Sequence, residues 1–485
     1  MRLALSILAL TLALAAPAAH ADGLPPVRHA FVIVLENKDF DQSFGPNSGA
    51  PYLARTLTRE GQLLRQYYGT SHVSLGNYIT MISGQAPNPD TQGDCMVGYK
   101  DVFPGTPTPD GQVLGAGCIY PHEVQTLGGQ LQQKGLDWKG YMEDMGTPCR
   151  HPAIGERDDT QTARADDQYA MRHNPFMYFH SVIDDDANCR SHVVDLKALA
   201  GDLQDAATTA AVSFITPDLC SDGHDAPCID GRPGGLASAD AFLKEWVPRI
   251  TGSPAFADGG LLFITWDEAN VGAGRQSDAC CDQPTGPNTP QPGIFGRGGG
   301  QTGSVAISPF VVPGSVNDTQ YNHYSLLRSL EDLFGLGHLG YAGQSGLRAF
   351  GSDVFGAQAT VDLTQTAGSS ARCQFRALSA RGGRLSPGSL VTALRLVRRR
   401  GRSAVLVITT ARRARLYVRE RGRPARRLQA RHGTDELLLA WRSARAEANA
   451  ALDHWRAVRT GEAFAAFRAA DDRADAAQDA LAARR

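Results

Sequence analysis

Three short apolar runs, each rich in β-branched residues, stand out along the chain. They are HAFVIVL (29–35), AAVSFIT (210–216) and GGLLFITW (259–266). Uninterrupted apolar runs of this length are typical of strands buried on both faces of a parallel sheet. Helical patterns lie between and after these runs, at 124–134, 237–250 and 321–336. The alternation predicts one α/β domain over residues 22–355, with a mostly parallel sheet and long Gly/Pro-rich loops.

Beyond this domain the pattern changes. Residues 356–388 have the composition of a linker. Residues 389–442 contain short strand-like runs separated by Arg- and Gly-containing turns, which predicts a small Arg-rich β module. Residues 443–485 are Ala-rich with scattered charge, and their propensity predicts a helical tail.

The N-terminus has the layout of a secretory signal peptide. Arg2 precedes an apolar run, and Ala19-His20-Ala21 is a small-x-small cleavage site. We expect residues 1–21 to be removed after Ala21, which predicts a secreted, periplasmic or cell-surface protein with no transmembrane segment in the mature chain. The alternative is an uncleaved membrane anchor, but the apolar run is short for a span and ends at Pro17.

Nine cysteines fit an oxidising compartment. Eight of them precede residue 300, which allows up to four disulfides there, although the spacing does not fix their connectivity. Cys220 and Cys228 are close enough for a local loop, and Cys373 is the odd one that could be free.

The total charge hides two opposite halves. The chain has 48 Lys+Arg against 50 Asp+Glu, a net of -2, which argues against a nucleic-acid-binding protein. From residue 372 onward, however, 26 Arg and no Lys stand against 10 Asp+Glu. This tail could contact an anionic cell envelope, lipid or polyphosphate; the alternative is a small module with solvated Arg faces.

Acidic residues follow each of the three predicted strands. The first strand leads into Glu36 and Asn37, and the third into Asp267 and Glu268; the second is followed by a loop that contains Asp218, Asp222, His224 and Asp225. In open parallel sheets the ligand crevice lies at the carboxyl ends of the strands, so these groups should converge. Convergent carboxylates repel one another, and a bound divalent cation is the usual counter-charge. The alternative is that each acid caps the helix or loop that follows it.

A candidate nucleophile lies in YYGTSHVSLGNYITMISG (67–84). Ser74 and Asn77 precede a helix-like run near Tyr78, where a serine would feel the positive end of the helix dipole. Asn77 could donate to an anionic oxygen. The alternative is that Ser74 is only the N-cap of that helix. Among the histidines, His224 and His323 are the first candidates, because each lies beside the acids or begins a helix; His72 and His173 come next.

The chain resembles the secreted bacterial acid phosphatase / phospholipase C phosphoesterase family of the alkaline phosphatase superfamily. The resemblance rests on seven segments in the family's order over residues 28–340: VIVLENKDFDQSFG, SHVSLGNYITMISGQ, RHNPFMYFHSV, TPDLCSDGHD, LLFITWDEAN, GSVAISPFVVPG and YNHYSLLRSLEDLFGL. It implies a three-layer αβα sandwich with a mostly parallel, alkaline-phosphatase-like sheet. The closest likeness is to the short exported acid phosphatases.

The resemblance also implies roles for individual residues. Ser74 matches the nucleophile that becomes phosphorylated, and Asn77 matches an Asn that holds the phosphoryl oxygens. His224 and His323 match active-site histidines that could ligate a second metal or donate protons. The remaining matches are metal ligands (Glu36, Asn37, Asp267, Glu268) and positions of a second metal or substrate site (Asp218, Asp222, His173).

Two departures from the family pattern affect the rim of this site. Many members read ENHSFD where this chain reads ENKDFD, so Lys38-Asp39 replaces His-Ser. Many read DMHD where this chain has Asp222-Gly223-His224-Asp225. Both changes keep the expected ligands.

The sequence thus predicts a metal-dependent hydrolase of phosphate monoesters, including phosphoinositides, that acts through a phosphoserine on Ser74. Its partners would be a phosphorylated small molecule or a phospholipid headgroup, and its cofactor one or two divalent cations. One alternative is a phospholipase C-type phosphodiesterase that uses the same site. The other is a catalytically inactive surface-binding protein, which the Arg-rich tail favours and the complete set of expected site residues disfavours.

Overall fold

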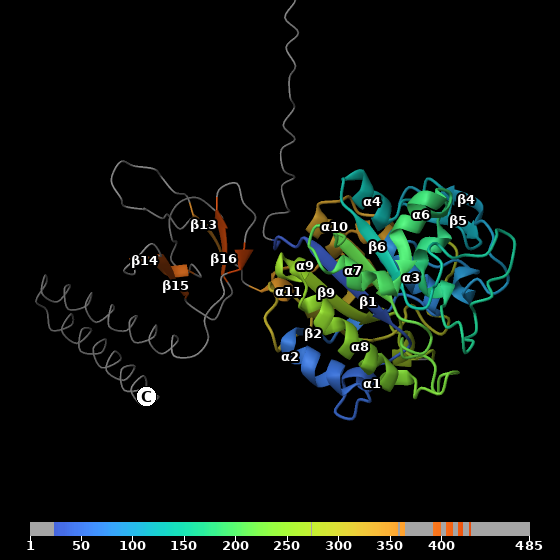
Figure 1. Ribbon diagram of the computed structural model, residues 1–485. Helices are drawn as coiled ribbons and strands as arrows, with labels where there is room; N and C mark the ends of the chain where they lie inside the picture. The colour runs from blue at the N-terminus through green and yellow to red at the C-terminus, as the bar shows by residue number, and fades with distance from the viewer. Residues whose placement is uncertain are drawn as a thin grey trace, which may run out of the picture. The chain divides into compact units, whose positions relative to one another are not determined.

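The computed structural model describes residues 24–272 and 274–356, together with five strands beyond them (Figure 1). The predicted signal peptide, Cys373 and the predicted helical tail lie outside the described residues, so these predictions stay open. Two compact units make up the chain, Met1–Arg426 and Arg427–Arg485, and nearly all described residues belong to the first.

An eight-stranded sheet forms the centre of the domain, in the order β11-β2-β10-β9-β1-β8-β6-β7. The bounds are β1 His29–Leu35, β2 Gln62–Leu64, β6 Trp138–Met142, β7 Val193–Asp195, β8 Val212–Thr216, β9 Gly260–Trp266, β10 Ser304–Ile307 and β11 Ser315–Asn317. β10 runs antiparallel to both of its neighbours, and the other pairings are parallel. The three predicted strands are β1, β8 and β9, which confirms the mostly parallel α/β fold.

Alternate residues of β1 pack into two different cores. Val32 and Val34 belong to a cluster with residues of α3 (Ser74–Ser83) and α10 (His323–Phe334). Phe31 and Ile33 belong to a second cluster, with residues of α8 (Gly235–Thr251). Because successive side chains of a strand point to opposite faces, the sheet lies between two helical layers, as Figure 1 shows. The expected three-layer αβα architecture is therefore confirmed.

Shorter elements complete the domain. The helices are α1 Phe40–Phe44, α2 Thr58–Glu60, α4 Leu127–Gln133, α5 His180–Ile183, α6 Asp186–His192, α7 Leu199–Asp202, α9 Pro254–Ala257 and α11 Ser352–Phe355. Two small sheets pair β3 Tyr67–Tyr68 with β12 Tyr321–Asn322, and β4 Phe103–Pro107 with β5 Val113–Ala116. Within the described part of the chain, none of the helices has the length and apolar character needed to cross a bilayer.

Five strands follow residue 356. β14 Val391–Arg398 pairs antiparallel with β15 Ala404–Thr410. β13 Ala359–Leu363 pairs parallel with β16 Leu416–Glu420, and β17 Arg426–Arg427 completes that sheet. β13 lies in the stretch 356–388 for which the composition predicted a linker.

Four disulfides connect eight cysteines: Cys95–Cys118, Cys149–Cys189, Cys220–Cys228 and Cys280–Cys281. The prediction of up to four bridges before residue 300, with Cys220 and Cys228 in a local loop, is confirmed.

Candidate active site

The carboxyl ends of β1 and β9 bring two pairs of predicted residues together. The Asp267 backbone N–H donates to the carbonyl of Leu35 at 2.8 Å, which continues the pairing of the two strands by one residue. The Asn37 backbone N–H then donates to Asp267 Oδ1 at 3.0 Å. Asn37 has a φ of 53°, which is tolerated by asparagine in the left-handed region. The two strand ends are thus joined through side chains that the sequence singled out.

Ser74 is the first residue of α3 and is only 3% exposed. The N-cap of this helix is Val73, so Ser74 is not the N-cap, which was the alternative to a nucleophile. Its hydroxyl donates instead to Glu36 Oε2 at 2.8 Å. This hydrogen bond joins the predicted nucleophile to a predicted metal ligand.

Glu36 receives two further hydrogen bonds. The Tyr78 hydroxyl donates to Oε1 at 2.6 Å, and Asn37 Nδ2 donates to Oε2 at 2.8 Å. Tyr78 is a site residue that the sequence interpretation missed. The available signal was its spacing, because residues four apart share a helix face and Tyr78 follows Ser74 by four.

Four buried carboxylates lie at this end of the sheet: Glu36, Asp222, Asp267 and Glu268. Burial raises the pKa of all four; Asp267 adds to the rise for Glu36, and Glu36 adds to it for Asp222 and Glu268. Both causes disfavour the ionised carboxylates, so a nearby positive charge would stabilise them.

Several polar atoms of this cluster are buried without a hydrogen-bond partner. They are Asp222 Oδ2, Asp267 Oδ2, Glu268 Oε1 and both ring nitrogens of His173. Buried polar atoms are normally paired, and oxygen-rich donor sets are those that hard divalent cations prefer. The chemistry of the donor set therefore fits a divalent cation.

His173 lies between two of these carboxylates. Its Nε2 is 3.5 Å from Glu36 Oε1, and its Nδ1 is 3.4 Å from Asp222 Oδ2. The ring stacks on Tyr78 with 5.2 Å between centroids and an interplanar angle of 12°. Burial, and then the neighbouring Arg172, lower the pKa of His173 well below its usual range, so the imidazole is neutral and its lone pair can bind a cation.

His72 orients Glu268. Its Nδ1 contacts Glu268 Oε2, and its Nε2 donates to the carbonyl of Gln276 at 2.7 Å. Both side chains are fully buried. A hydrogen-bonding partner behind a carboxylate fixes the orientation of that carboxylate, so His72 restrains Glu268.

Asn77 and His323 are occupied by the protein itself. Asn77 Oδ1 accepts the backbone N–H groups of Thr70 and Ser71, each at 2.8 Å, and its Nδ2 donates to the Ser71 carbonyl at 2.9 Å. His323 Nε2 donates to the Asp267 carbonyl, so in the neutral ring Nδ1 accepts from the Tyr67 hydroxyl at 3.1 Å. Burial lowers the pKa of His323 to about 4. Both side chains therefore hold the loops that carry other site residues.

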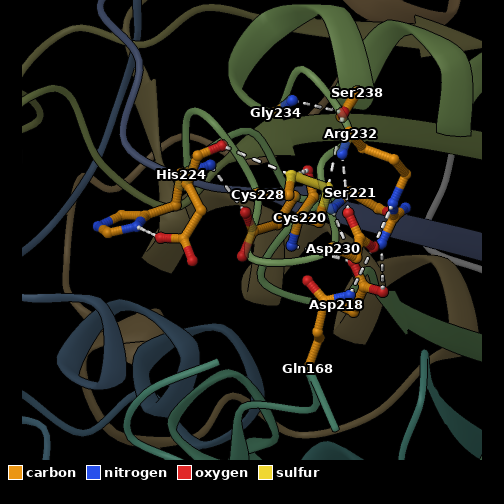
Figure 2. The surroundings of a disulfide bond; sticks show 12 residues. Gln168, Asp218, Cys220, Ser221, His224, Cys228, Asp230, Arg232, Gly234 and Ser238 are labelled. Carbon is orange, nitrogen blue, oxygen red and sulfur yellow. Dashed lines mark hydrogen bonds and ion pairs between the residues drawn. A yellow bond between two sulfur atoms is a disulfide. The ribbon is translucent and has the colours of Figure 1, made fainter. Parts of the chain in front are cut away.

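The loop after β8 carries the last predicted residues, and Figure 2 shows how its disulfide holds it. Asp218 Oδ1 accepts the N–H groups of Cys220 and Ser221 at 3.0 and 2.7 Å, so this carboxylate organises the loop. The His224 side chain is 47% exposed, and its Nδ1 is 2.7 Å from Asp225 Oδ1. The Asp222 carbonyl accepts the Glu36 N–H at 2.9 Å. Of this loop, Asp222 joins the buried cluster, His224 lies at the surface and Asp218 faces the loop.

A tighter group of possible ligands lies elsewhere. Over the described ranges, Cys220, Cys228 and Asp230 form the one group of three whose ligand atoms all lie within 4.8 Å of one another. Its two cysteines are joined in a disulfide and offer no thiolate. The buried carboxylates, in contrast, have oxygens without a hydrogen-bond partner.

A buried serine that donates to one of four clustered carboxylates, at the carboxyl end of a parallel sheet, defines a hydrolase-type site. Residues 47–337 match the Phosphoesterase family, and this chain belongs to that family. The resemblance found in the sequence is confirmed, and the chain is an enzyme that hydrolyses phosphoric ester bonds.

Named relatives are about a quarter identical to this chain over the residues that align. A phosphatidylinositol-3-phosphatase of Mycobacterium tuberculosis is 26% identical over 322 residues, which is 66% of this chain and 82% of that protein. A phosphate-repressible acid phosphatase of Penicillium chrysogenum is 26% identical over 308 residues, but the match spans only 59% of its length. A protein in the alkaline phosphatase superfamily from Vibrio parahaemolyticus aligns at a TM-score of 0.38 and 12% identity, over 65% of this chain and 68% of that one.

Proposed function

We propose that this chain is an exported, metal-dependent acid phosphatase that hydrolyses phosphate monoesters, phosphoinositides included, through a phosphoserine on Ser74. The observation that carries the proposal is the 2.8 Å hydrogen bond from the Ser74 hydroxyl to Glu36 within a buried carboxylate cluster. The names of the mycobacterial and fungal relatives support the substrate class. Export rests on the predicted signal peptide.

The chain's own residues supply the positioning for two displacements. Glu36 orients the Ser74 hydroxyl and can accept its proton while Oγ attacks phosphorus and the bond to the leaving oxygen breaks. The leaving oxygen takes a proton from His224 or from water. Water then attacks phosphorus, the bond from phosphorus to Ser74 Oγ breaks, and the proton held by Glu36 returns to that oxygen as phosphate leaves. Asn77 and His323 hold the loops around Ser74 and Asp267 and act as positioning residues.

We assign the divalent cation to Glu36, Asn37, Asp267 and Glu268. Bound there, it would supply the positive charge that stabilises a serine alkoxide and the phosphoryl oxygens. His173 and Asp222 are the residues that could hold a second cation. Asp218 is not needed in either set, because its carboxylate faces its own loop.

The direct test replaces Ser74 with alanine. Ser74→Ala should lower kcat on 4-nitrophenyl phosphate by about 1,000-fold or more, since a covalent step is lost. Acid quench of the wild type with labelled substrate should trap phosphate on Ser74. Ser83→Ala is the matched control, because Ser83 is a buried serine of the same helix whose hydroxyl donates to the Ile79 carbonyl. A Ser74→Ala protein with wild-type turnover would overturn the proposal.

A phospholipase C-type phosphodiesterase is the second candidate, because the same nucleophile and carboxylates could serve a diester. Comparing hydrolysis of a phosphate monoester with that of a phosphocholine diester separates the two activities. Preference for the diester would replace the acid phosphatase assignment while keeping the nucleophile.

A further inference from the structure

Lys38 and Asp39, the pair that departs from the family pattern, face different parts of the structure. The Asp39 carboxylate accepts the Asn270 backbone N–H at 3.2 Å and Gln276 Nε2 at 3.1 Å. It therefore holds the loop that follows β9. Lys38 is joined to that loop only through its backbone N–H, which donates to the Glu268 carbonyl at 3.1 Å. The Lys38 side chain does not take part in this contact with the loop.

The Lys38 ammonium is half-buried at the edge of the carboxylate cluster. Its Nζ donates to the Asn37 carbonyl at 3.1 Å. Burial lowers the pKa of the Lys38 ammonium, and the negative charges of Asp222, Glu36 and Asp267 oppose this lowering. Yet no carboxylate oxygen of the described residues lies within ion-pair distance of this ammonium. The result is a positive charge beside the candidate site with two N–H donors to spare.

The other basic groups near the cluster are already paired. Arg172 is buried, with its Nε 3.6 Å from Asp94 Oδ2 and its Nη1 donating to the Gln161 carbonyl at 3.2 Å. His224 pairs with Asp225. Lys38 is therefore the cation of the described site that remains available to a ligand.

A cation at this position could distinguish phosphate monoesters from diesters, because the two differ in charge and in the number of unesterified oxygens. A phosphate monoester has three unesterified oxygens and carries up to two negative charges, with a second pKa near 6. A diester has two unesterified oxygens and one charge. An ammonium that donates to the third oxygen gains a charge-assisted hydrogen bond from the monoester alone. In a diester this position is taken by an esterified oxygen and its substituent.

We propose that Lys38 is a specificity-determining residue that binds the third unesterified oxygen of a phosphate monoester and so makes this chain favour monoesters over diesters. This inference rests on the proposed function and adds the basis of substrate choice. The juxtaposition that carries it is a half-buried ammonium that bonds to the Asn37 carbonyl but has no carboxylate partner, beside the cluster that receives the Ser74 hydroxyl.

The experiment measures kcat/KM of Lys38→Met and Lys38→Arg on 4-nitrophenyl phosphate and on bis(4-nitrophenyl) phosphate. Lys38→Met should lower the monoester value by about 10- to 100-fold, since one charge-assisted hydrogen bond is lost, and change the diester value by less than about threefold. Lys38→Arg should recover part of the monoester value. The loss should be larger at pH 7 than at pH 5, because the monoester is dianionic only at the higher pH.

Two further measurements separate substrate binding from other roles. The affinity for inorganic phosphate, measured by calorimetry, should weaken about tenfold or more in Lys38→Met, and the bound-metal content should stay unchanged. Lys100→Met is the matched control, because Lys100 pairs with Asp90 at 3.3 Å and its side chain is 52% exposed. It should behave as the wild type in every assay.

The outcomes distinguish this inference from the proposed function. A wild type without monoesterase activity would defeat both. A wild type that is active, with an unchanged monoester-to-diester ratio in Lys38→Met, would overturn the role of Lys38 alone. Equal losses on both substrates, or a loss of bound metal in the variant, would also overturn it. Should Lys38→Met fail to fold, Lys38→Gln tests the same loss of charge.

Discussion

The Asp94 carboxylate accepts a hydrogen bond from the backbone N–H of Leu75 at 2.9 Å, from a separate segment of the chain. Leu75 is the residue after Ser74, and the N-cap of α3 supplies no side-chain cap of its own. Asp94 therefore caps the helix that presents the proposed nucleophile. The buried Arg172 holds the second oxygen of this carboxylate at 3.6 Å, so helix start, cap and arginine form one unit.

Removing this cap should affect both stability and turnover. Asp94→Ala should lower the free energy of unfolding by about 2–4 kcal/mol, because a helix cap is lost and Arg172 is left buried without its partner. We expect kcat to fall by about tenfold through displacement of Ser74. Urea unfolding and steady-state kinetics measure the two effects.

Asp94→Asn keeps an acceptor for the Leu75 N–H. Its free energy of unfolding and its kcat should therefore lie between those of Asp94→Ala and the wild type. Asp90→Asn is the control, because Asp90 pairs with the exposed Lys100. Wild-type kcat in Asp94→Ala would show that the cap does not position Ser74.

Loss of His72 should weaken cation binding. His72 connects Glu268 to the Gln276 carbonyl, so His72→Ala frees a proposed ligand to rotate. The affinity for the divalent cation should fall by about 10- to 100-fold, as is usual when a residue behind a ligand is removed. Competition with a chelator, followed by metal analysis, gives the affinity. His338→Ala removes a surface histidine that pairs with Asp332 and should bind the cation as tightly as the wild type; equal affinities in both variants would contradict the assignment of Glu268.

Removing either of two disulfides should affect stability and turnover to different degrees. Losing Cys149–Cys189, whose cysteines are 40 positions apart in the sequence, should cost about 4 kcal/mol by the chain-entropy relation. For Cys220–Cys228, whose cysteines are 8 positions apart, the cost is about 2.5 kcal/mol. For kcat we expect the opposite order. Loss of Cys220–Cys228 should lower kcat more, because the loop that this bridge closes carries Asp222.

Double Cys→Ser variants of each bridge test this comparison by denaturant unfolding and kcat. We expect the variant without Cys149–Cys189 to keep kcat within about twofold and the other to lose about fivefold or more. The same order in both measurements would indicate that the loop after β8 does not need its disulfide to place Asp222.

Glu331 should make stability decline with rising pH. Burial raises the pKa of this α10 residue from its ordinary value of 4.5 to about 9. The folded chain thus binds this proton more tightly than the unfolded chain, so the stabilisation is complete below about pH 4.5 and is lost as the pH rises toward about 9.

Glu331→Gln keeps an acceptor for the Leu339 N–H, which the Glu331 Oε1 receives at 2.8 Å, but cannot ionise. Its stability relative to wild type should therefore increase between pH 5 and pH 9, by about 1 kcal/mol or more. Urea midpoints across this range measure the difference. A constant difference would show that Glu331 titrates normally.

The convergence of the carboxylates could be predicted because it depends on the local sequence pattern. Each follows a run of buried apolar residues, and parallel strands end at one edge of the sheet, so Glu36 and Asp267 had to be close. The position of Asn77 near Ser74 could be read from the sequence, but its partners could not be foreseen, since they are backbone groups of Thr70 and Ser71 whose direction depends on the folded loop.

Asp94 and Arg172 escaped prediction for a different reason. Asp94 lies just after a three-residue 3-10 helix (Thr91–Gly93) and Arg172 lies within another (Met171–His173). Both helices are too short to show a hydrophobic periodicity, and the contact joins regions far apart in sequence. Their types, an acid and a base, are also the commonest on protein surfaces, so only the observed burial distinguishes them. The four-residue spacing from Ser74 could have indicated Tyr78, because both lie on one face of the helix. It was missed because a buried tyrosine usually indicates core packing.

The position of β1 sets the order in which the enzyme can be built during synthesis. β1 is the first strand to be made, but its neighbours in the sheet begin near Val212 and Gly260. At roughly 5–20 residues per second, translation takes about 10–50 s to supply both partners. Until then β1, which leads into Glu36, has neither of its neighbouring strands to pair with. Any fragment that ends before Asp267 also lacks two of the four clustered carboxylates. Nascent chains should therefore remain inactive, and open to chaperones or export factors, until most of the domain has been translated.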